Sequence, residues 1–171
     1  ALAAAQRVDM VRVHDVEAMV RVARTSDALV RGWRHHEVYV GIGTNMGDRE
    51  ANIKGALQAL ADLPETWVEA CSSLYETGPV GYVEQPPFYN MVVRLRTGLD
   101  PRRLLRELMA IEKDFGRVRD GERWGPRPLD LDILLFDDVV SGADWLTLPH
   151  PRMEERGFVL VPLAEIAPDV A

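Results

Sequence analysis

Apolar and polar residues alternate along four segments of the chain, and this period of two predicts β-strands. In the first segment, Val38, Val40 and Ile42 alternate with Tyr39 and Gly41. Each predicted strand therefore presents one apolar face to a core and a second face away from it. The four predicted strands are residues 37–43, approximately 67–76, 88–96 and 129–137.

Apolar residues recur at helical spacing in two segments between the strands. The first predicted helix follows a glycine-bearing turn at residues 41–48, with Asp48 as its N-cap, and runs towards Pro64. No Lys-Ser or Lys-Thr pair follows the glycines, so we favour a tight turn over a phosphate-binding loop. The second helix has Asp100 as its expected N-cap, Pro101 in its first turn and a glycine at its end. Its buried stripe is predicted to be Leu104, Leu105, Leu108, Ile111 and Phe115.

The order strand, helix, strand, strand, helix, strand predicts an α+β fold of the ferredoxin-like βαββαβ type. In such a sandwich two helices cover one face of an antiparallel four-stranded sheet, and the other face is left for a site. Extra C-terminal elements are expected after Asp138. They are a short strand at 146–148, a turn at 150–151, a helical turn at 152–156 and an apolar packing segment at 159–166.

Composition and charge narrow the class of protein. A chain of 171 residues with 47% hydrophobic residues can bury the core of one domain with an appendage. The formal net charge of −7 argues against a general nucleic-acid binder, which needs a basic surface to neutralise phosphates. The single cysteine, Cys71, excludes an intramolecular disulfide. Without an apolar run of membrane-spanning length or a signal peptide, we expect a soluble, cytoplasmic protein.

The densest chemistry lies between residues 117 and 133, where an arginine-rich loop runs into the fourth strand. Asp130 and Asp132 share one face of that strand, with Cα atoms roughly 6.5 to 7 Å apart. This spacing suits one or two Mg²⁺ ions, and guanidinium groups beside Mg²⁺ are typical of polyphosphate sites. A solvated loop with ordinary ion pairs remains open as an alternative. Trp124, between charged residues and Gly125, could stack on a base or ring.

Three separated motifs, at residues 77–90, 116–133 and 148–158, resemble those of the 6-hydroxymethyl-7,8-dihydropterin pyrophosphokinase family. The resemblance extends from about Val38 to Asp169 and is specific, because the motifs occur in the family's order and spacing. It implies a Mg²⁺-dependent diphosphokinase of folate biosynthesis. Such an enzyme transfers diphosphate from ATP to 6-hydroxymethyl-7,8-dihydropterin and releases AMP, with small-molecule substrates and neither nucleic acid nor membrane as partner.

The resemblance also assigns residues on the ATP side. Asp130 and Asp132 are expected to hold two Mg²⁺ ions against the β- and γ-phosphates. Arg117 and Arg127 match two arginines of a mobile loop that engages the phosphates, so these two arginines and the two aspartates are the expected catalytic residues. Further nucleotide contacts are expected from Glu112, Arg119, Trp124, Ile133, Thr147, His150 and Arg156.

On the pterin side, the resemblance implies that Phe88 and Phe158 sandwich the ring and that Asn90 reads its edge. Structural interpretations stay open for three residues: Phe158 as a core residue, Phe88 as the start of its strand and His150 as a turn residue. An amide inside a strand is harder to explain without a role, because a buried amide needs hydrogen-bond partners. The expected pterin-binding residues are Thr77, Gly78, Pro79, Val80, Phe88, Asn90, Trp124 and Phe158.

Residues 1–36 differ from the rest and form an expected N-terminal extension before a pyrophosphokinase domain at residues 37–171. Residues 9–29 resemble the C-terminal end of dihydropteroate synthase, with Arg12 and His14 at its anion-binding pair. We interpret the segment as a non-catalytic fusion remnant or an upstream extension of the reading frame, and its origin implies a link to dihydropteroate synthase.

Two other classes of function are compatible with parts of the sequence. A four-stranded sheet with two helices can stack RNA bases on exposed aromatic residues. The acidic net charge, the paired aspartates and the lack of an aromatic-rich strand motif argue against that class. A non-catalytic partner module that docks through residues 1–36 is the third hypothesis. Formation of AMP from ATP and the pterin alcohol discriminates between the three.

Overall fold

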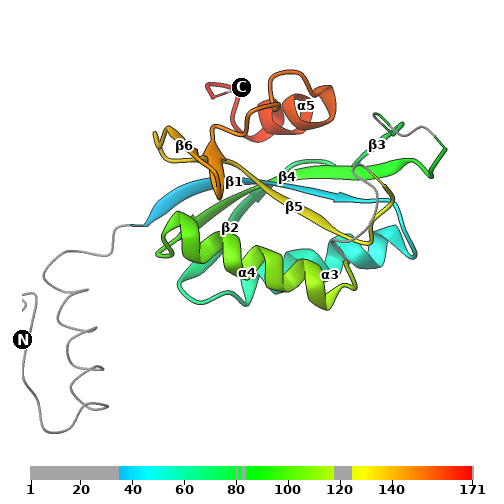
Figure 1. Ribbon diagram of the computed structural model, residues 1–171, viewed down its shortest axis with the longest axis horizontal. Coiled ribbons are helices and arrows are strands. Elements are labelled where there is room, and N and C mark those ends of the chain that lie inside the picture. The colour runs from blue at the N-terminus through cyan, green and yellow to red at the C-terminus, as the bar shows by residue number, and fades with distance from the viewer. Residues whose placement is uncertain (1–34, 80, 82–83, 118–124, 171) are drawn as a thin grey trace, which may run out of the picture. The chain divides into compact units, whose positions relative to one another are not determined.

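The computed structural model describes residues 35–79, 81, 84–117 and 125–170 (Figure 1). Residues 36–171 form one compact unit. Its helices are α3 (Arg49–Ala61), α4 (Pro101–Asp114) and α5 (Gly157–Ile166). Its strands are β1 (His36–Thr44), β2 (Thr66–Cys71), β3 (Tyr75–Thr77), β4 (Phe88–Thr97), β5 (Asp130–Phe136), β6 (Ser141–Ala143) and β7 (Leu146–Leu148).

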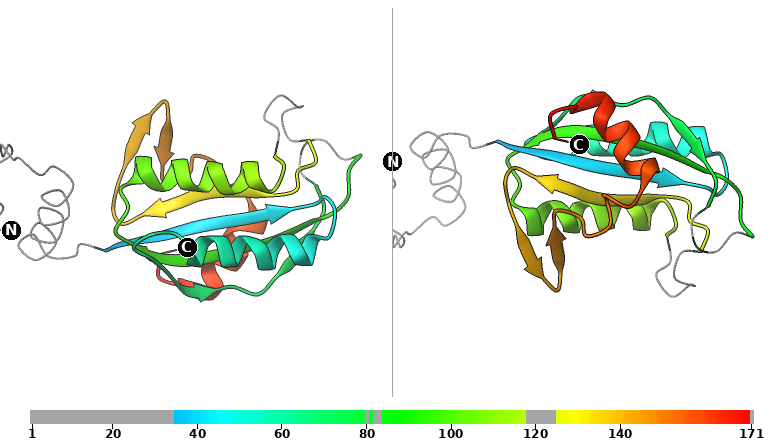
Figure 2. Two further views of the ribbon diagram at one scale, coloured as in Figure 1. Left: turned by 90° about the horizontal axis from the view of Figure 1, so that it is seen from below. Right: turned by 90° about the horizontal axis from the view of Figure 1, so that it is seen from above.

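The main sheet has the strand order β2-β4-β1-β5, with β3 also paired to β4. All of these pairs are antiparallel. Figure 2 shows α3 and α4 side by side on one face of the sheet, and α5 on the opposite face. The predicted ferredoxin-like βαββαβ sandwich is confirmed, with β2 and β3 together in the place of the second strand.

Local chemistry sets where the helices begin and end. The carboxylate of Asp48 accepts a hydrogen bond from Ala51 N at 3.0 Å, and that of Asp100 accepts one from Arg103 N at 2.9 Å. Both predicted N-caps are therefore confirmed, since each satisfies an amide that the first turn leaves unpaired. Gly116 ends the second helix with φ +85°, a conformation that favours glycine.

The main core lies between the sheet and the two helices α3 and α4. Its predicted helical stripe is largely confirmed, because Leu104, Leu108 and Ile111 are buried, while Leu105 and Phe115 pack at its edge. A second cluster joins the other face of the sheet to α5. Its buried members are Tyr39, Val92, Leu134, Met153, Val159, Leu163 and Ala167.

Two predictions about the strands need correction. The segment predicted as one strand at 67–76 is broken, because the Ser72 hydroxyl accepts a hydrogen bond from Val92 N at 3.0 Å and so disturbs the ladder. A contact from helix α5 also stabilises the break, since the Glu165 carboxylate accepts hydrogen bonds from Ser73 N and Ser73 Oγ. The glycine-bearing turn is shorter than predicted, because β1 continues through residue 44.

The C-terminal elements cover only part of the second sheet face. The short strand β7 and the apolar packing segment are confirmed, the latter as helix α5, while residues 152–156 form consecutive turns without a regular helix. The hairpin partner of β7, strand β6, was not predicted. Beyond the N-terminal end of α5, this face of the sheet stays open and carries the side chains described next. Among the described residues, no helix is long and apolar enough to cross a membrane.

Candidate active site

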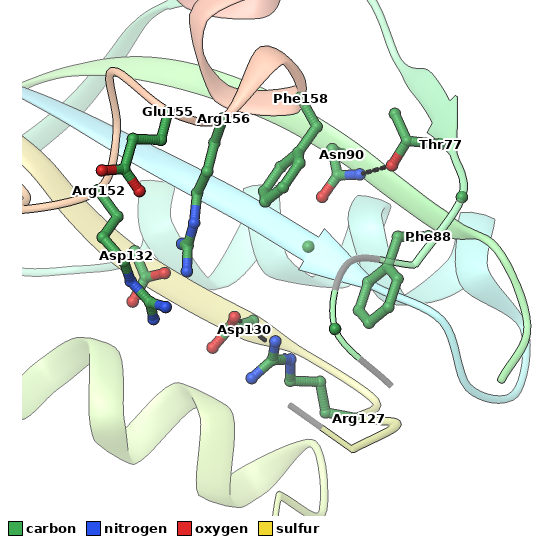
Figure 3. A pocket seen from close by; sticks show the side chains of 13 residues that line it. Thr77, Phe88, Asn90, Arg127, Asp130, Asp132, Arg152, Glu155, Arg156 and Phe158 are labelled. Atoms are coloured by element: carbon green, nitrogen blue, oxygen red, sulfur yellow. Dashed lines mark hydrogen bonds and ion pairs between the residues drawn. The ribbon is translucent and has the colours of Figure 1, made fainter. Parts of the chain in front are cut away.

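Asp130 and Asp132 share the open face of the sheet, at the start of β5. The residues between and beyond them, Leu131 and Ile133, are 4% and 3% exposed and belong to the core on the opposite face. Figure 3 shows both carboxylates in a cleft, with Phe158 and Phe88 bordering it further along. The cleft is lined by Gly43, Thr77, Gly78, Gly81, Phe88, Asn90, Arg127, Asp130, Asp132, Arg152, Glu155, Arg156 and Phe158.

The Asp130 carboxylate pairs with two arginines. Arg117 Nη1 pairs with Asp130 Oδ1, and Arg127 Nε lies 3.3 Å from Asp130 Oδ2. Arg117 also pairs with Glu112, which is 2% exposed and accepts a hydrogen bond from Leu131 N at 2.9 Å. Arg117, just after α4, and Arg127, just before β5, therefore converge on one carboxylate.

Asp132 has a different environment. Burial, and next the negative charge of Asp130, raise its pKa to about 6, against the opposing charges of Arg127 and Arg156. Its Oδ2 atom lies 4.0 Å from His150 Nε2, and its side chain is 44% exposed to the cleft. A carboxylate with a raised pKa beside a second carboxylate gains from a bound cation, because the cation removes the repulsion between them.

His150 approaches Asp132 because its segment is fastened to β5. His150 N donates to Leu134 O at 2.8 Å, and its Nδ1 accepts from Arg152 N at 3.3 Å. Burial, and next the charges of Arg156 and Arg152, lower the pKa of His150. A pKa below the ordinary 6.5 favours the neutral ring at pH 7, and the acceptor role of Nδ1 assigns the ring proton to Nε2, the nitrogen nearest Asp132.

The far side of the cleft has the features of a slot for a flat ring. Phe88 comes from the start of β4 and Phe158 from the start of α5, and Asn90 lies between their backbones on the sheet (Figure 3). Asn90 is 7% exposed, and its Nδ2 donates to Thr77 Oγ1 at 2.7 Å. A guanidinium stands over each ring, Arg127 at 5.7 Å from Phe88 and Arg156 at 5.6 Å from Phe158.

Gly43 separates the ring side from the carboxylate side. It pairs with Asn90 on β4 and with Asp130 on β5, so these two residues flank it at a Cα separation of about 10 Å. A Cβ atom at this position would lie 3.2 Å from Asn90 Oδ1 and 3.8 Å from Asp130 Cβ. The missing side chain keeps the two halves of the cleft in open contact.

The described residues that line the cleft carry balanced charge. The cations Arg127, Arg152 and Arg156 face the anions Asp130, Asp132 and Glu155. Such a lining does not by itself attract a polyanion. A divalent cation on the two aspartates would give the cleft a positive charge and make it suitable for a polyphosphate.

Comparison with known proteins identifies the family. Residues 39–168 match the model of the family "7,8-dihydro-6-hydroxymethylpterin-pyrophosphokinase (HPPK)". The chain belongs to this family. It is 48% identical over 132 residues to a Bacillus subtilis 2-amino-4-hydroxy-6-hydroxymethyldihydropteridine pyrophosphokinase, covering 77% of this chain and 78% of the relative. The Pseudomonas aeruginosa pyrophosphokinase is 50% identical over 133 residues, covering 78% and 82%.

A third relative has a composite name. The Arabidopsis thaliana "Folate synthesis bifunctional protein, mitochondrial" is 47% identical over 131 residues, which are 77% of this chain and 23% of that protein. As a member of the pyrophosphokinase family, this chain transfers diphosphate from ATP to 6-hydroxymethyl-7,8-dihydropterin in folate biosynthesis. The reaction releases AMP. The enzyme hypothesis is thus favoured over the RNA-binding and partner-module hypotheses.

The structure brings most of the predicted site residues of this pyrophosphokinase together. Nine line the cleft, and Arg117, Glu112 and His150 lie next to it through their contacts with Asp130, Arg117 and Asp132. The nine are Thr77, Gly78, Phe88, Asn90, Arg127, Asp130, Asp132, Arg156 and Phe158.

Other predicted residues of the family site lie elsewhere. The Ile133 side chain is buried in the core, so this residue offers the cleft only its main chain. Thr147 is exposed on β7, and neither it nor Pro79 lines the cleft. Val80, Arg119 and Trp124 fall outside the described residues.

Among the described residues that line the cleft, four are not predicted from the sequence as site residues: Gly43, Gly81, Arg152 and Glu155. The sequence analysis places Gly43 in a turn, although a glycine within a strand can also mark a position where a ligand or another backbone approaches closely. Arg152 and Glu155 lie in a turn whose sequence has no periodicity. The one sequence signal for their place in the site is that they are charged and close to His150 and Arg156.

The described residues contain no group of three or more His, Cys, Asp or Glu side chains suited to a metal.

Proposed function

We propose that Asp130 and Asp132 hold two Mg²⁺ ions on the ATP phosphates during diphosphate transfer. The observation that carries this proposal is that both carboxylates share the open face of β5 in one cleft. The donor set fits, because Mg²⁺ binds through one or two carboxylates and takes its other ligands from phosphate oxygens and water. When bound, the ions would withdraw charge from the β-phosphorus that the pterin alcohol attacks.

Arg117 and Arg127 have the role of phosphate clamps. Both arginines pair with the Asp130 carboxylate. With a cation held by Asp130, Arg117 and Arg127 would be free to leave that pairing and to bind phosphate oxygens of the nucleotide. They would then stabilise the charge that develops on the transferred group and on the leaving AMP.

His150 and Arg156 are proposed to bind the nucleotide phosphates beside Asp132. The neutral His150 ring can donate its Nε2 proton to an oxygen without adding charge, while Arg156 supplies a fixed positive charge at the cleft wall. Glu112 acts through Arg117, and Ile133 through its main chain. For Arg119, Trp124 and Thr147, the proposed nucleotide contacts rest on family resemblance alone.

The pterin is proposed to lie between Phe88 and Phe158. Offset stacking on both faces favours a flat bicycle, and Asn90 Oδ1 remains available to a ring donor while its Nδ2 binds Thr77. The loop residues Gly78, Pro79 and Val80, together with Trp124, complete the proposed ring site. Across Gly43, the hydroxymethyl group would then point towards the phosphates held at Asp130.

The test is to incubate the protein with ATP, Mg²⁺ and 6-hydroxymethyl-7,8-dihydropterin and to identify the released nucleotide. AMP is expected, whereas ADP would indicate transfer of one phosphate. Asp130→Ala and Asp132→Ala should each abolish turnover and Mg²⁺-dependent nucleotide binding while keeping the fold. Asp138→Ala is the matched control, because this carboxylate is exposed beyond the end of β5. Wild-type activity in either cleft variant would contradict the metal assignment.

We further propose that residues 1–36 supply no catalytic group and reflect a link to dihydropteroate synthase. Resemblance to that enzyme supports this proposal, as does the existence of a bifunctional relative in Arabidopsis thaliana.

A further inference from the structure

Asn45 is a buried polar residue with no role in the site described so far. It follows β1 directly, is 2% exposed and does not line the cleft. Its Nδ2 donates to Gln85 Oε1 at 2.9 Å and to Pro86 O at 3.1 Å. Its Oδ1 accepts from Arg127 N at 2.9 Å. Both amide donors and the amide oxygen are thus engaged, which satisfies a buried amide.

The two segments that Asn45 joins lie far apart in sequence and lead into different halves of the cleft. Residues 85–86 precede Phe88 at the start of β4, and Arg127 precedes Asp130 at the start of β5. The main chain strengthens one connection, because Asn45 N also donates to Arg127 O at 3.2 Å. The Asn45 side chain therefore joins residues 85–86, on the ring side of the cleft, to Arg127, on the phosphate side.

The two joined segments also meet inside the cleft. The Arg127 guanidinium stands 5.7 Å from the centre of the Phe88 ring, and its Nε lies 3.3 Å from Asp130. A shift of either segment therefore changes where a ring stacked on Phe88 lies relative to phosphates bound by Arg127. Transfer between two bound substrates is sensitive to such a shift, because the attacking oxygen and the phosphorus must be in line.

We infer that Asn45 is a positioning residue for diphosphate transfer, which sets the alignment of the pterin half of the cleft with the phosphate half. The inference rests on the proposed roles of Phe88, Arg127 and Asp130. Asparagine suits this role because one short side chain provides an acceptor for Arg127 N and two donors for the opposite segment. Aspartate keeps the acceptor and loses both donors, and alanine loses all three.

Loss of Asn45 should loosen the two segments without unfolding them. Arg49 Nη1 still donates to Pro87 O at 2.9 Å, and Asn52 Nδ2 still donates to Pro128 O at 3.1 Å. Helix α3 therefore keeps one contact to each segment in an Asn45 variant. The variant tests alignment in a folded enzyme.

The experiment measures single-turnover AMP formation by Asn45→Ala and Asn45→Asp, together with KM for ATP and for the pterin alcohol. Single turnover is chosen because product release can hide a slower chemical step. We expect Asn45→Ala to slow the chemical step about 10- to 100-fold, with each KM changed by less than about threefold. Asn45→Asp should be at least as slow as the alanine variant, because it keeps the acceptor for Arg127 N but turns a second oxygen towards the acceptors Gln85 Oε1 and Pro86 O.

A buried polar residue at the far end of the sheet provides the control for lost stability. Thr97 is 0% exposed, binds the Thr66 hydroxyl at 2.7 Å and accepts from Leu99 N at 3.1 Å. Thr97→Val should lower the melting temperature and leave the single-turnover rate unchanged. If Asn45→Ala shows the wild-type rate, or loses activity only in proportion to its unfolded fraction, the inference is overturned. Absence of AMP with the wild type would overturn the proposed function itself.

Discussion

Replacement of Asp132 by asparagine should stabilise the protein while it abolishes activity. The raised pKa of Asp132, about 6 against an ordinary 3.8, means that the folded state disfavours the charged carboxylate. The difference between these two pKa values corresponds to an upper limit of about 3 kcal/mol. Because the side chain is 44% exposed, solvent screening reduces the expected gain to about 1 kcal/mol.

The gain should depend on pH in a defined direction. Below about pH 4 the Asp132 carboxyl is protonated in both folded and unfolded states, and the substitution has no electrostatic effect. The penalty in the wild type develops as the pH rises from about 4 to about 6, because the unfolded chain loses its proton first. Above the folded pKa the full advantage of Asp132→Asn should be present, worth about 3 °C in melting temperature for a domain of this size.

The assay is thermal unfolding of both proteins in EDTA between pH 4 and pH 8. Addition of Mg²⁺ with a nonhydrolysable ATP analogue should stabilise the wild type more than the variant, since only the wild type keeps both carboxylates. Asp130→Asn is the matched control and should be destabilising by about 1 kcal/mol or more, because it leaves Arg117 and Arg127 without their shared partner. A variant Asp132→Asn that melts below the wild type at pH 8 would refute the reasoning.

Three further predictions concern the ring site and the extension. Phe158→Ala should raise KM for the pterin at least about tenfold and leave KM for ATP nearly unchanged, as steady-state kinetics would show. Gly43→Ala should lower kcat/KM for the pterin, because the added methyl group approaches Asn90 Oδ1 to 3.2 Å; an unchanged value would remove the spacing argument. Deletion of residues 1–34 should preserve AMP formation. The deletion keeps His36, the first residue of β1. The Nδ1 atom of this residue lies 2.6 Å from Asp137 Oδ2, and the variant retains that contact.

Much of the fold could be predicted because its signals are local. The alternation in the strands and the cap chemistry of Asp48 and Asp100 depend on neighbours within a few residues. The break after β2 could not be predicted in this way. It depends on Glu165, which is 92 residues away from Ser73 in sequence and reaches it only once α5 has packed on the sheet.

The candidate site shows the same division. Strand periodicity predicts that Asp130 and Asp132 share one face. The family motifs indicate that Phe88, Asn90 and Phe158 bind the ring. The function of Asn45 is not visible in the sequence, because an asparagine between a strand and a helix is also an ordinary turn residue. Its partners at Gln85, Pro86 and Arg127 are defined only by tertiary packing.

The bare backbone at Gly43 has a consequence for ligand design. With no partition between the ring slot and the carboxylates, the cleft is a single chamber in which one rigid molecule could occupy both halves. A flat heterocycle joined by a short linker to an anionic group would avoid the entropic cost of assembling two separate ligands. A mutation that gave resistance to such a molecule by placing a bulkier residue at position 43 would also narrow the passage that the natural substrates need.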